Sequence, residues 1–408
     1  MRRLRACAFA ILALAAFVRA HPAHAVDPAF TRFIASLRSD AERAGVSRAT
    51  FEAATRGLEP DDKLPDLELP GRKPQLAPQA EFVQVPADYL NEGSIARLAA
   101  AGREVRQKHR ATLDRIERDF GVPGAIVLAI WARETDYGRF KPTYNAIRTL
   151  ATQAYVGRRK EQFRNEFVLA LKMMQDGYGS PQMRSSWAGA IGLTQLIPSE
   201  FYKNAVDFDG DGRIDIFNSV PDALAITAKQ LRSKGWQPGL RWAYEVRAPQ
   251  GADCTLGVPE VSRPIGEWIG TGFVPADGAR LTGSEQAQSA SLLQPEGIYG
   301  PAFLTTKNYF VIKDYNFSDL YVLFVGHLAD RIAGRGRFVT PWSATQQMRT
   351  ADVETMQKYL ARIGLYNDKI DGKAGMQTRA ALGAFQKQAR LKVDCWPNAE
   401  SLRAMTAR

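Results

Sequence analysis

The chain has 408 residues, with 54 Lys and Arg against 43 Asp and Glu, and a formal net charge of +11. This length allows more than one domain. The basic excess suits an anionic polymer or a membrane surface, although ordinary solubility charge accounts for most of it. No stretch combines clustered Lys or Arg with interleaved aromatic residues. We therefore expect no nucleic-acid partner. The few cysteines and histidines have no zinc-site spacing, so no zinc is expected.

The first 25 residues have the organisation of a secretory signal peptide. A basic start precedes an apolar run over residues 6–18 and the small-residue cleavage sequence Ala23-His24-Ala25. The run is too short for a comfortable membrane span. We expect export to the periplasm, cleavage before Val26 and no span elsewhere. Cleavage would remove four arginines and no acidic residues, which lowers the formal net charge from +11 to +7.

The spacing of apolar residues predicts the elements that follow. Amphipathic helices are expected over 30–37 and around Phe51, and then an extended proline-rich segment from Pro60 to Pro86. Helical periodicity then dominates to about Trp236. Residues 240–320 are typical of short strands and loops, and a last helix over 320–332 leads into a glycine-rich boundary.

Glu134 is the first candidate for chemistry. Pro123 suits the first turn of its predicted helix and Gly138 marks the end. Apolar residues share its face at helical spacing: Ile126, Val127 and Ile130. A carboxyl group in apolar surroundings resists ionisation and can donate a proton near neutral pH, as cleavage of a glycosidic bond requires. The alternative is a buried ion pair with an arginine.

A second segment, Gly189-Ala-Ile-Gly-Leu-Thr-Gln195-Leu-Ile-Pro198-Ser199, places a glutamine in a glycine-bearing turn that a sugar could approach. Together with Glu134-Thr-Asp-Tyr-Gly138, it resembles the B-type lytic murein transglycosylases, glycoside hydrolase family 103 of the lysozyme-like superfamily. The resemblance covers about residues 30–335. It includes further blocks in family order: 187–192, 205–212, 221–223, 235–236, 300–303 and 315–318.

The resemblance implies an α+β, mainly helical fold. A lysozyme-like catalytic core would carry a helical N-terminal region and a small strand-containing subdomain. Glu134 takes the position of the family's catalytic acid/base. The positions that line the family's glycan groove are Ser186, Gln195, Tyr315 and Asn316, and Tyr137 is a further candidate sugar contact. Gln230 departs from the family, which usually has a tyrosine there, so one sugar-stacking contact is in question.

The implied reaction needs one carboxyl group. Glu134 would protonate the oxygen between N-acetylmuramic acid and N-acetylglucosamine, and then accept a proton from the C6 hydroxyl as 1,6-anhydromuramic acid forms. Asp136 lies about 200° round an ideal helix from Glu134 and should face elsewhere, but Glu166 could fold nearby. A hydrolytic muramidase with a second carboxylate and a catalytically silent wall-binding protein remain alternatives.

The segment 207–215 has the oxygen-ligand spacing of a calcium loop. Asp207, Asp209 and Asp211 occupy alternate positions, and Arg213 would contribute its carbonyl. The usual closing glutamate is absent, and relatives indicate that Asp222 closes a longer loop instead. We expect one structural Ca²⁺ and no organic cofactor. The alternative is an Asp/Gly turn with solvated charges.

Residues 349–408 form a separate helical module. Two amphipathic helices flank the turn at Asp371-Gly372, and the pattern resembles the peptidoglycan-binding type 1 domain, a three-helix module. It departs at Cys395, where glycine is commoner. We expect the module to tether the enzyme to glycan strands of the wall. An oxidising compartment permits a disulfide between Cys254 and Cys395, but their spacing leaves this open.

These features divide the chain into four segments. They are a signal peptide at 1–25, a catalytic domain at 26–335 with its core at about 105–240, a linker at 336–348, and a peptidoglycan-binding domain at 349–408.

Overall fold

The computed structural model describes residues 27–72, 84–343 and 348–407. Within these ranges, no helix combines the length and apolar character needed to cross a bilayer. The predicted signal peptide lies outside the described residues, as does much of the proline-rich segment.

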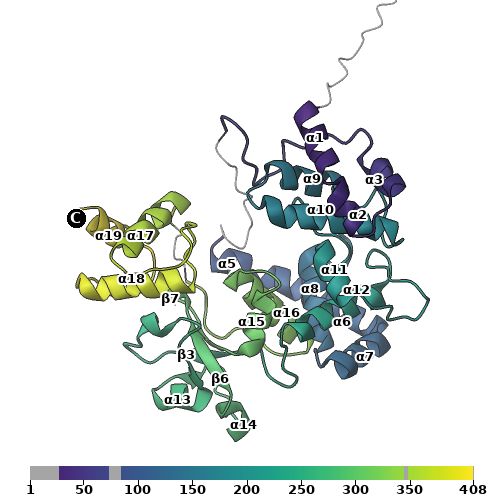
Figure 1. The fold of residues 1–408 in the computed structure, drawn as a ribbon. Coiled ribbons are helices and arrows are strands. Elements are labelled where there is room, and N and C mark those ends of the chain that lie inside the picture. The colour runs from purple at the N-terminus through teal and green to yellow at the C-terminus, as the bar shows by residue number, and fades with distance from the viewer. Residues whose placement is uncertain (1–26, 73–83, 344–347, 408) are drawn as a thin grey trace, which may run out of the picture.

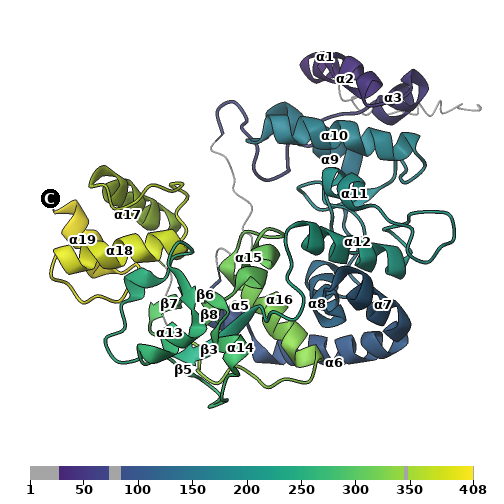
Figure 2. The ribbon, with the colours of Figure 1, turned by 60° about the horizontal axis from the view of Figure 1, so that its bottom comes forward.

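Short helices open the described chain and pack on a longer pair. The bounds are α1 (Pro28–Ser36), α2 (Arg38–Arg43), α3 (Arg48–Thr55), α9 (Ala146–Val156) and α10 (Lys160–Gln175). Phe30 and Phe51 from the short helices and Phe167 from α10 share one buried cluster. Figures 1 and 2 show α1–α3 lying over α9 and α10 at one end of the molecule. This confirms the helical N-terminal region.

A second, larger core surrounds α8 (Gly124–Thr135). Every residue of α8 from Gly124 to Ala132 is buried, so its apolar surface extends all round the helix rather than along one stripe. The remaining helices of this region are α5 (Pro86–Tyr89), α6 (Glu92–Lys108), α7 (Arg110–Phe120), α11 (Pro198–Asn204), α12 (Val220–Ser233), α15 (Lys307–Lys313) and α16 (Asp319–Ile332). Helices α6, α7, α12 and α16 contact α8 directly.

An antiparallel sheet forms the small subdomain, with strand order β4-β6-β8-β3-β5. Its strands are β3 (Ala243–Arg247), β4 (Ser262–Pro264), β5 (Val274–Pro275), β6 (Ser289–Leu293) and β8 (Ala302–Thr305). Short elements accompany it: η1 (Cys254–Leu256), α13 (Ile265–Gly270), α14 (Gly283–Gln286) and β7 (Pro295–Ile298). A two-stranded sheet, β1 (Tyr144–Asn145) with β2 (Arg184–Ser185), lies apart in the helical region.

The C-terminal module comprises α17 (Thr350–Arg362), α18 (Met376–Gln388) and α19 (Ala399–Thr406), which share a small core of their own. The predicted fold class is therefore confirmed.

The described part of the segment predicted as a linker contacts the catalytic region. Phe338 stacks on His327 with 3.9 Å between ring centroids, and Glu245 accepts from the backbone N–H groups of Val339 and Thr340. These residues pack on the catalytic region.

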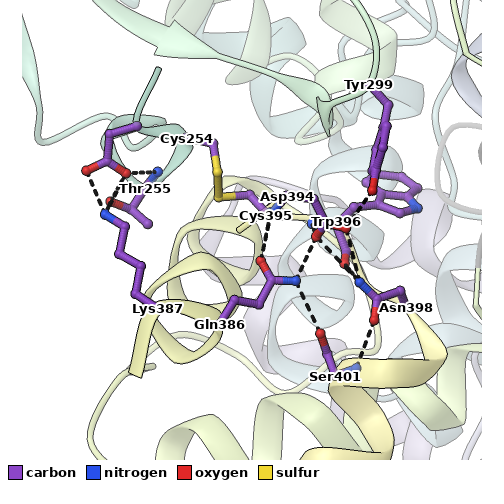
Figure 3. The surroundings of a disulfide bond; sticks show 11 residues. Cys254, Thr255, Tyr299, Gln386, Lys387, Asp394, Cys395, Trp396, Asn398 and Ser401 are labelled. Atoms are coloured by element: carbon purple, nitrogen blue, oxygen red, sulfur yellow. Dashed lines mark hydrogen bonds and ion pairs between the residues drawn. A yellow bond between two sulfur atoms is a disulfide. The ribbon is translucent and has the colours of Figure 1, made fainter. Parts of the chain in front are cut away.

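A disulfide joins Cys254 of η1 to Cys395 of the C-terminal module, with 6.1 Å between their Cα atoms. Figure 3 shows it beside the network that Gln386 forms inside the module. The backbone at Cys395 has φ of +52°, in the left-handed region that favours glycine. Glycine would adopt this conformation without the steric cost that a side chain brings. The disulfide, which the sequence left open, fixes the module to the sheet subdomain.

Candidate functional site

Glu134 is the last residue but one of α8 and is partly exposed. The Tyr321 hydroxyl, from the first turn of α16, donates a hydrogen bond of 2.6 Å to Glu134 Oε1. Tyr321 is 1% exposed. Burial and the neighbouring Glu134 charge raise the pKa of Tyr321 well above its usual range. The hydroxyl therefore keeps its proton, and one carboxylate oxygen of Glu134 has a fixed donor.

The glycine-bearing loop at 189–199 is joined to α8 next to Glu134. Thr135 Oγ1 donates to the Leu193 carbonyl at 2.6 Å. Gly189 has φ of +79°, and a Cβ there would lie 2.2 Å from the Leu150 side chain, so only glycine fits. The loop is thereby held against the helix end that carries the candidate acid.

Two predicted groove residues brace this loop. Gln195 has φ of +54°, an uncommon conformation for a residue with a side chain, and its Nε2 donates to the Gly192 carbonyl at 2.9 Å. Ser186 Oγ accepts from the backbone N–H groups of Ala188 and Ala190 at 3.3 and 3.2 Å. Both side chains are partly exposed, so they can meet a ligand from positions fixed by the backbone.

Tyr315 connects the loop to the Glu134–Tyr321 pair. Its hydroxyl donates to the Thr194 carbonyl at 2.6 Å, and its ring lies nearly parallel to that of Tyr321, with centroids 6.5 Å apart. Burial and the charge of Glu134 raise the pKa of Tyr315. Asn316 follows, and its Oδ1 accepts from the Ser318 N–H at 3.2 Å. Contacts therefore run from Glu134 through Tyr321 and Tyr315 to the loop that carries Gln195.

Tyr137 lies apart from this set. It is 9% exposed, its hydroxyl donates to the Leu98 carbonyl at 2.9 Å, and its ring meets Trp131 edge-on. The backbone at Tyr137 has φ of +56°, which turns the side chain into the core after the helix has ended. This packing leaves little of the ring for a sugar.

The predicted orientation of Asp136 needs correction. Helix α8 ends at Thr135, and Asp136 has φ of +48°, so an ideal-helix angle does not apply. Asp136 and Glu134 line the same depression, together with Arg97, Leu98, Ala132, Arg133, Phe140 and Phe324. The Asp136 carboxylate lies 3.5 Å from Arg97 and 3.9 Å from Arg139. A second acid is therefore near Glu134, held between two guanidinium groups.

Glu166 lies in α10, among the helices of the N-terminal core. Its carboxylate is buried and accepts from the Ser199 backbone N–H at 2.9 Å, at the start of α11. Burial raises the pKa of Glu166. This carboxyl group supports the exit of the glycine-bearing loop.

The acidic loop brings three of its predicted metal ligands together. One carboxylate oxygen from each of Asp207, Asp209 and Asp211 lies within 4.8 Å of the others. Asp222 is buried beneath the loop instead, where its two oxygens accept from the backbone N–H groups of Phe208 and Asp215. Arg213 is exposed at the end of the acidic run. The residues fit a hard cation on one side, with Asp222 supporting the loop from the other.

No pattern in the sequence indicates that Tyr321 contacts Glu134 or that Arg379 contacts Asp319. Tyr321 lies within an apolar helical run, where an aromatic residue ordinarily indicates packing. Its position six residues after Tyr315, in the first turn of a capped helix, was the available clue. The departure at Gln230 falls on a buried position of α12.

Comparison with known proteins supports the resemblance seen in the motifs. Residues 29–330 match the transglycosylase SLT domain family, and residues 349–405 match a peptidoglycan binding domain. The membrane-bound lytic murein transglycosylase B of Escherichia coli is 30% identical over 234 residues, which are 55% of this chain and 61% of that protein. The chain thus spans less than two thirds of this curated relative.

Solved structures extend the likeness to the whole fold. SltB3 from Pseudomonas aeruginosa, in complex with NAG-NAM-pentapeptide, is 35% identical with a TM-score of 0.82, over 92% of this chain and 99% of that one. The Escherichia coli lytic transglycosylase Slt35, solved in complex with calcium, shares the fold at 22% identity and a TM-score of 0.58, over 75% of this chain and 93% of that one. Since the SLT match covers well over half of its residues, the chain belongs to the transglycosylase SLT domain family.

Proposed function

We propose that the chain is a peptidoglycan lytic transglycosylase that cleaves the β-1,4 bond between N-acetylmuramic acid and N-acetylglucosamine, with Glu134 as its single acid/base. The observation that carries the proposal is a partly exposed carboxylate with a tyrosine donor on one oxygen, joined to a braced polar loop. Because the carboxyl group is partly exposed, it can reach a substrate oxygen while its orientation stays fixed.

In the first step Glu134 gives its proton to the glycosidic oxygen as the bond to the anomeric carbon breaks. The departing N-acetylglucosamine leaves with that proton, and an oxocarbenium-like centre remains on the muramic acid. In the second step the ionised Glu134 accepts the proton of the C6 hydroxyl, whose oxygen bonds to the anomeric carbon. The product is 1,6-anhydromuramic acid, Glu134 regains its proton, and no water is consumed.

The groove residues would bind and orient the sugar. Ser186 and Gln195 present polar groups from a rigid turn, and Tyr315 and Asn316 do so from the segment before α16. Relatives support this substrate class, since SltB3 was solved in complex with NAG-NAM-pentapeptide and with NAG-anhNAM-pentapeptide. We leave Tyr137 out of the proposed contacts because of its burial.

We further propose the domain boundaries given above, with periplasmic export directed by residues 1–25. The two family matches at 29–330 and 349–405 support the division between a catalytic and a wall-binding part. Because residues 338–340 pack on the catalytic region, we assign a structural role to the described part of the linker.

We propose that Asp207, Asp209, Asp211 and the Arg213 carbonyl would hold one structural Ca²⁺. Three converging carboxylates in a tight turn with two left-handed glycines, Gly210 and Gly212, support this. The ion would stabilise the loop that precedes α12 and takes no part in the proposed proton transfers.

Replacement of Glu134 by Gln tests the catalytic proposal. The variant should bind purified sacculi as wild type does, yet release no soluble fragments. Glu117→Gln, at an exposed position of α7, is the matched control and should cleave normally. Retained cleavage by Glu134→Gln would remove the assignment, and wild-type binding without any cleavage would favour a silent wall-binding protein.

A further inference from the structure

The C-terminal module is held against the catalytic region at many points. Besides the disulfide, Lys387 Nζ lies 2.7 Å from the Asp253 carboxylate, and Tyr299 donates to Asp394 at 2.8 Å. At Gly297 the approach is so close that a Cβ would lie 2.0 Å from the Asp394 carbonyl. Figure 2 shows α18 beside the sheet strands, with α15 and α16 next to them. The module therefore has a fixed orientation rather than a free tether.

The first turn of α18 enters the catalytic core. Met376 is buried and belongs to the same apolar cluster as α8 and α16. One turn later, Arg379 is 7% exposed. Its Nη1 donates to the Ala374 carbonyl at 2.6 Å and its Nη2 donates to Asp319 Oδ2 at 3.0 Å. A buried guanidinium of the module thus pairs with a carboxylate of the catalytic domain.

Asp319 is the first residue of α16 and joins three helices. Its Oδ1 accepts from Lys313 Nζ and from the Tyr309 hydroxyl, both of α15, and its Oδ2 accepts from Arg379 of α18. Burial alone would raise the pKa of Asp319, but the charges of Lys313 and Arg379 outweigh it and hold the pKa well below its usual range. The carboxylate therefore stays ionised between its two cations.

This junction adjoins two of the predicted groove residues along the chain. Lys313 and Asp319 bracket the short segment 314–318, which carries Tyr315 and Asn316. Two residues beyond Asp319, Tyr321 donates to Glu134. The position of Asp319 therefore sets both the closure of this segment and the start of the helix turn that supplies the Tyr321 hydroxyl.

We propose that Arg379 is a positioning residue for the reaction: from the wall-binding module it anchors Asp319, and so places Tyr315, Asn316 and Tyr321 around Glu134. The inference rests on the proposed function of Glu134. The module then contributes to turnover itself, separately from any role in binding the wall. Loss of the guanidinium would leave Asp319 paired on one side only, free to shift the first turn of α16.

The test uses the full chain and soluble glycan oligomers. Arg379→Ala should lower kcat roughly tenfold, since small displacements in a catalytic array have effects of this order or larger. Arg379→Lys, which keeps the charge, should recover part of the loss, and binding to sacculi should be unchanged. Lys387→Ala breaks an ion pair between the same two parts but away from α16, so it should retain wild-type kcat.

A kcat of Arg379→Ala that equals the kcat of Lys387→Ala would overturn the proposal. This holds whether both variants keep the wild-type kcat or both lose the same amount without recovery in Arg379→Lys. If the alanine variant fails to fold, Arg379→Gln decides the question, because it preserves more of the volume and can still donate to the Ala374 carbonyl. Unchanged kcat in that variant would also overturn the inference. Activity of Glu134→Gln would instead refute the proposed function, whatever Arg379 does.

Discussion

Removal of the Tyr321 hydroxyl should impair catalysis without disturbing the fold. Tyr321→Phe deletes one 2.6 Å hydrogen bond to the Glu134 carboxylate and keeps a ring that can still stack on Tyr315. A hydrogen bond to a charged group contributes about 1.5–3 kcal/mol. If that energy orients the acid in the transition state, kcat falls roughly 10- to 150-fold. KM should change little, because the hydroxyl contacts Glu134 and not the sugar in this account.

The assay is the initial rate of release of soluble fragments from a defined glycan, with kcat and KM determined separately. Tyr244→Phe is the matched control. Its hydroxyl also belongs to a buried tyrosine and donates to Gln288 at 3.0 Å, but it lies in the sheet subdomain. Both variants should lose similar stability. A kcat for Tyr321→Phe within twofold of that for Tyr244→Phe would refute the role assigned to Tyr321.

Three further predictions concern stability. Cys395→Ser opens a covalent loop that spans 141 residues in sequence. On the chain-entropy relation, this should lower the free energy of unfolding by up to about 5 kcal/mol. Denaturant titration measures the change, and an unchanged denaturation midpoint would contradict the prediction. Burial lowers the pKa of His327 from 6.5 to about 4 despite Glu92 beside it, so its neutral form contributes about 3 kcal/mol that is present above pH 6.5 and lost as the pH falls to 4. The difference in unfolding free energy between wild type and His327→Gln should shrink as the pH falls from 6.5 to about 4. A difference that stays constant over this pH range would refute the prediction. Calcium should raise the Tm of wild type and not that of Asp207→Asn, whereas equal Tm values with calcium and with chelator would exclude the proposed ion.

The sequence was most informative where function depends on a contiguous segment. The helix that carries Glu134 and the turn that carries Gln195 were both predicted, because apolar periodicity and glycines with positive φ leave local traces. The terminal helical module was predicted from the same kind of pattern, and the strands of the small subdomain fall within the predicted range 240–320, although the end of that range is helical, since α15 spans Lys307–Lys313. For the helix of Glu134 and the turn of Gln195, the determining interactions lie within a few residues of one another, whereas the strands of the sheet pair over long separations, as β3 does with β8.

Features set by the ends of elements or by distant contacts were not predictable in this way. Helix α8 ends at Thr135, so Asp136 and Tyr137 take left-handed conformations that re-aim both side chains. Asp222 was expected to complete the calcium ligands, yet it accepts from backbone N–H groups beneath the loop. The pairing of Arg379 with Asp319 spans 60 residues, and no local pattern marks it.

The most direct test of the central claim is the mass of the fragments released from purified peptidoglycan by the mature protein. The account predicts disaccharide-peptides one water lighter than hydrolytic products, because the C6 hydroxyl of the muramic acid takes the place of water, and none of these with Glu134→Gln. Products of full hydrolytic mass would contradict the single-acid mechanism. They would direct attention to Asp136, the carboxylate that lines the same depression.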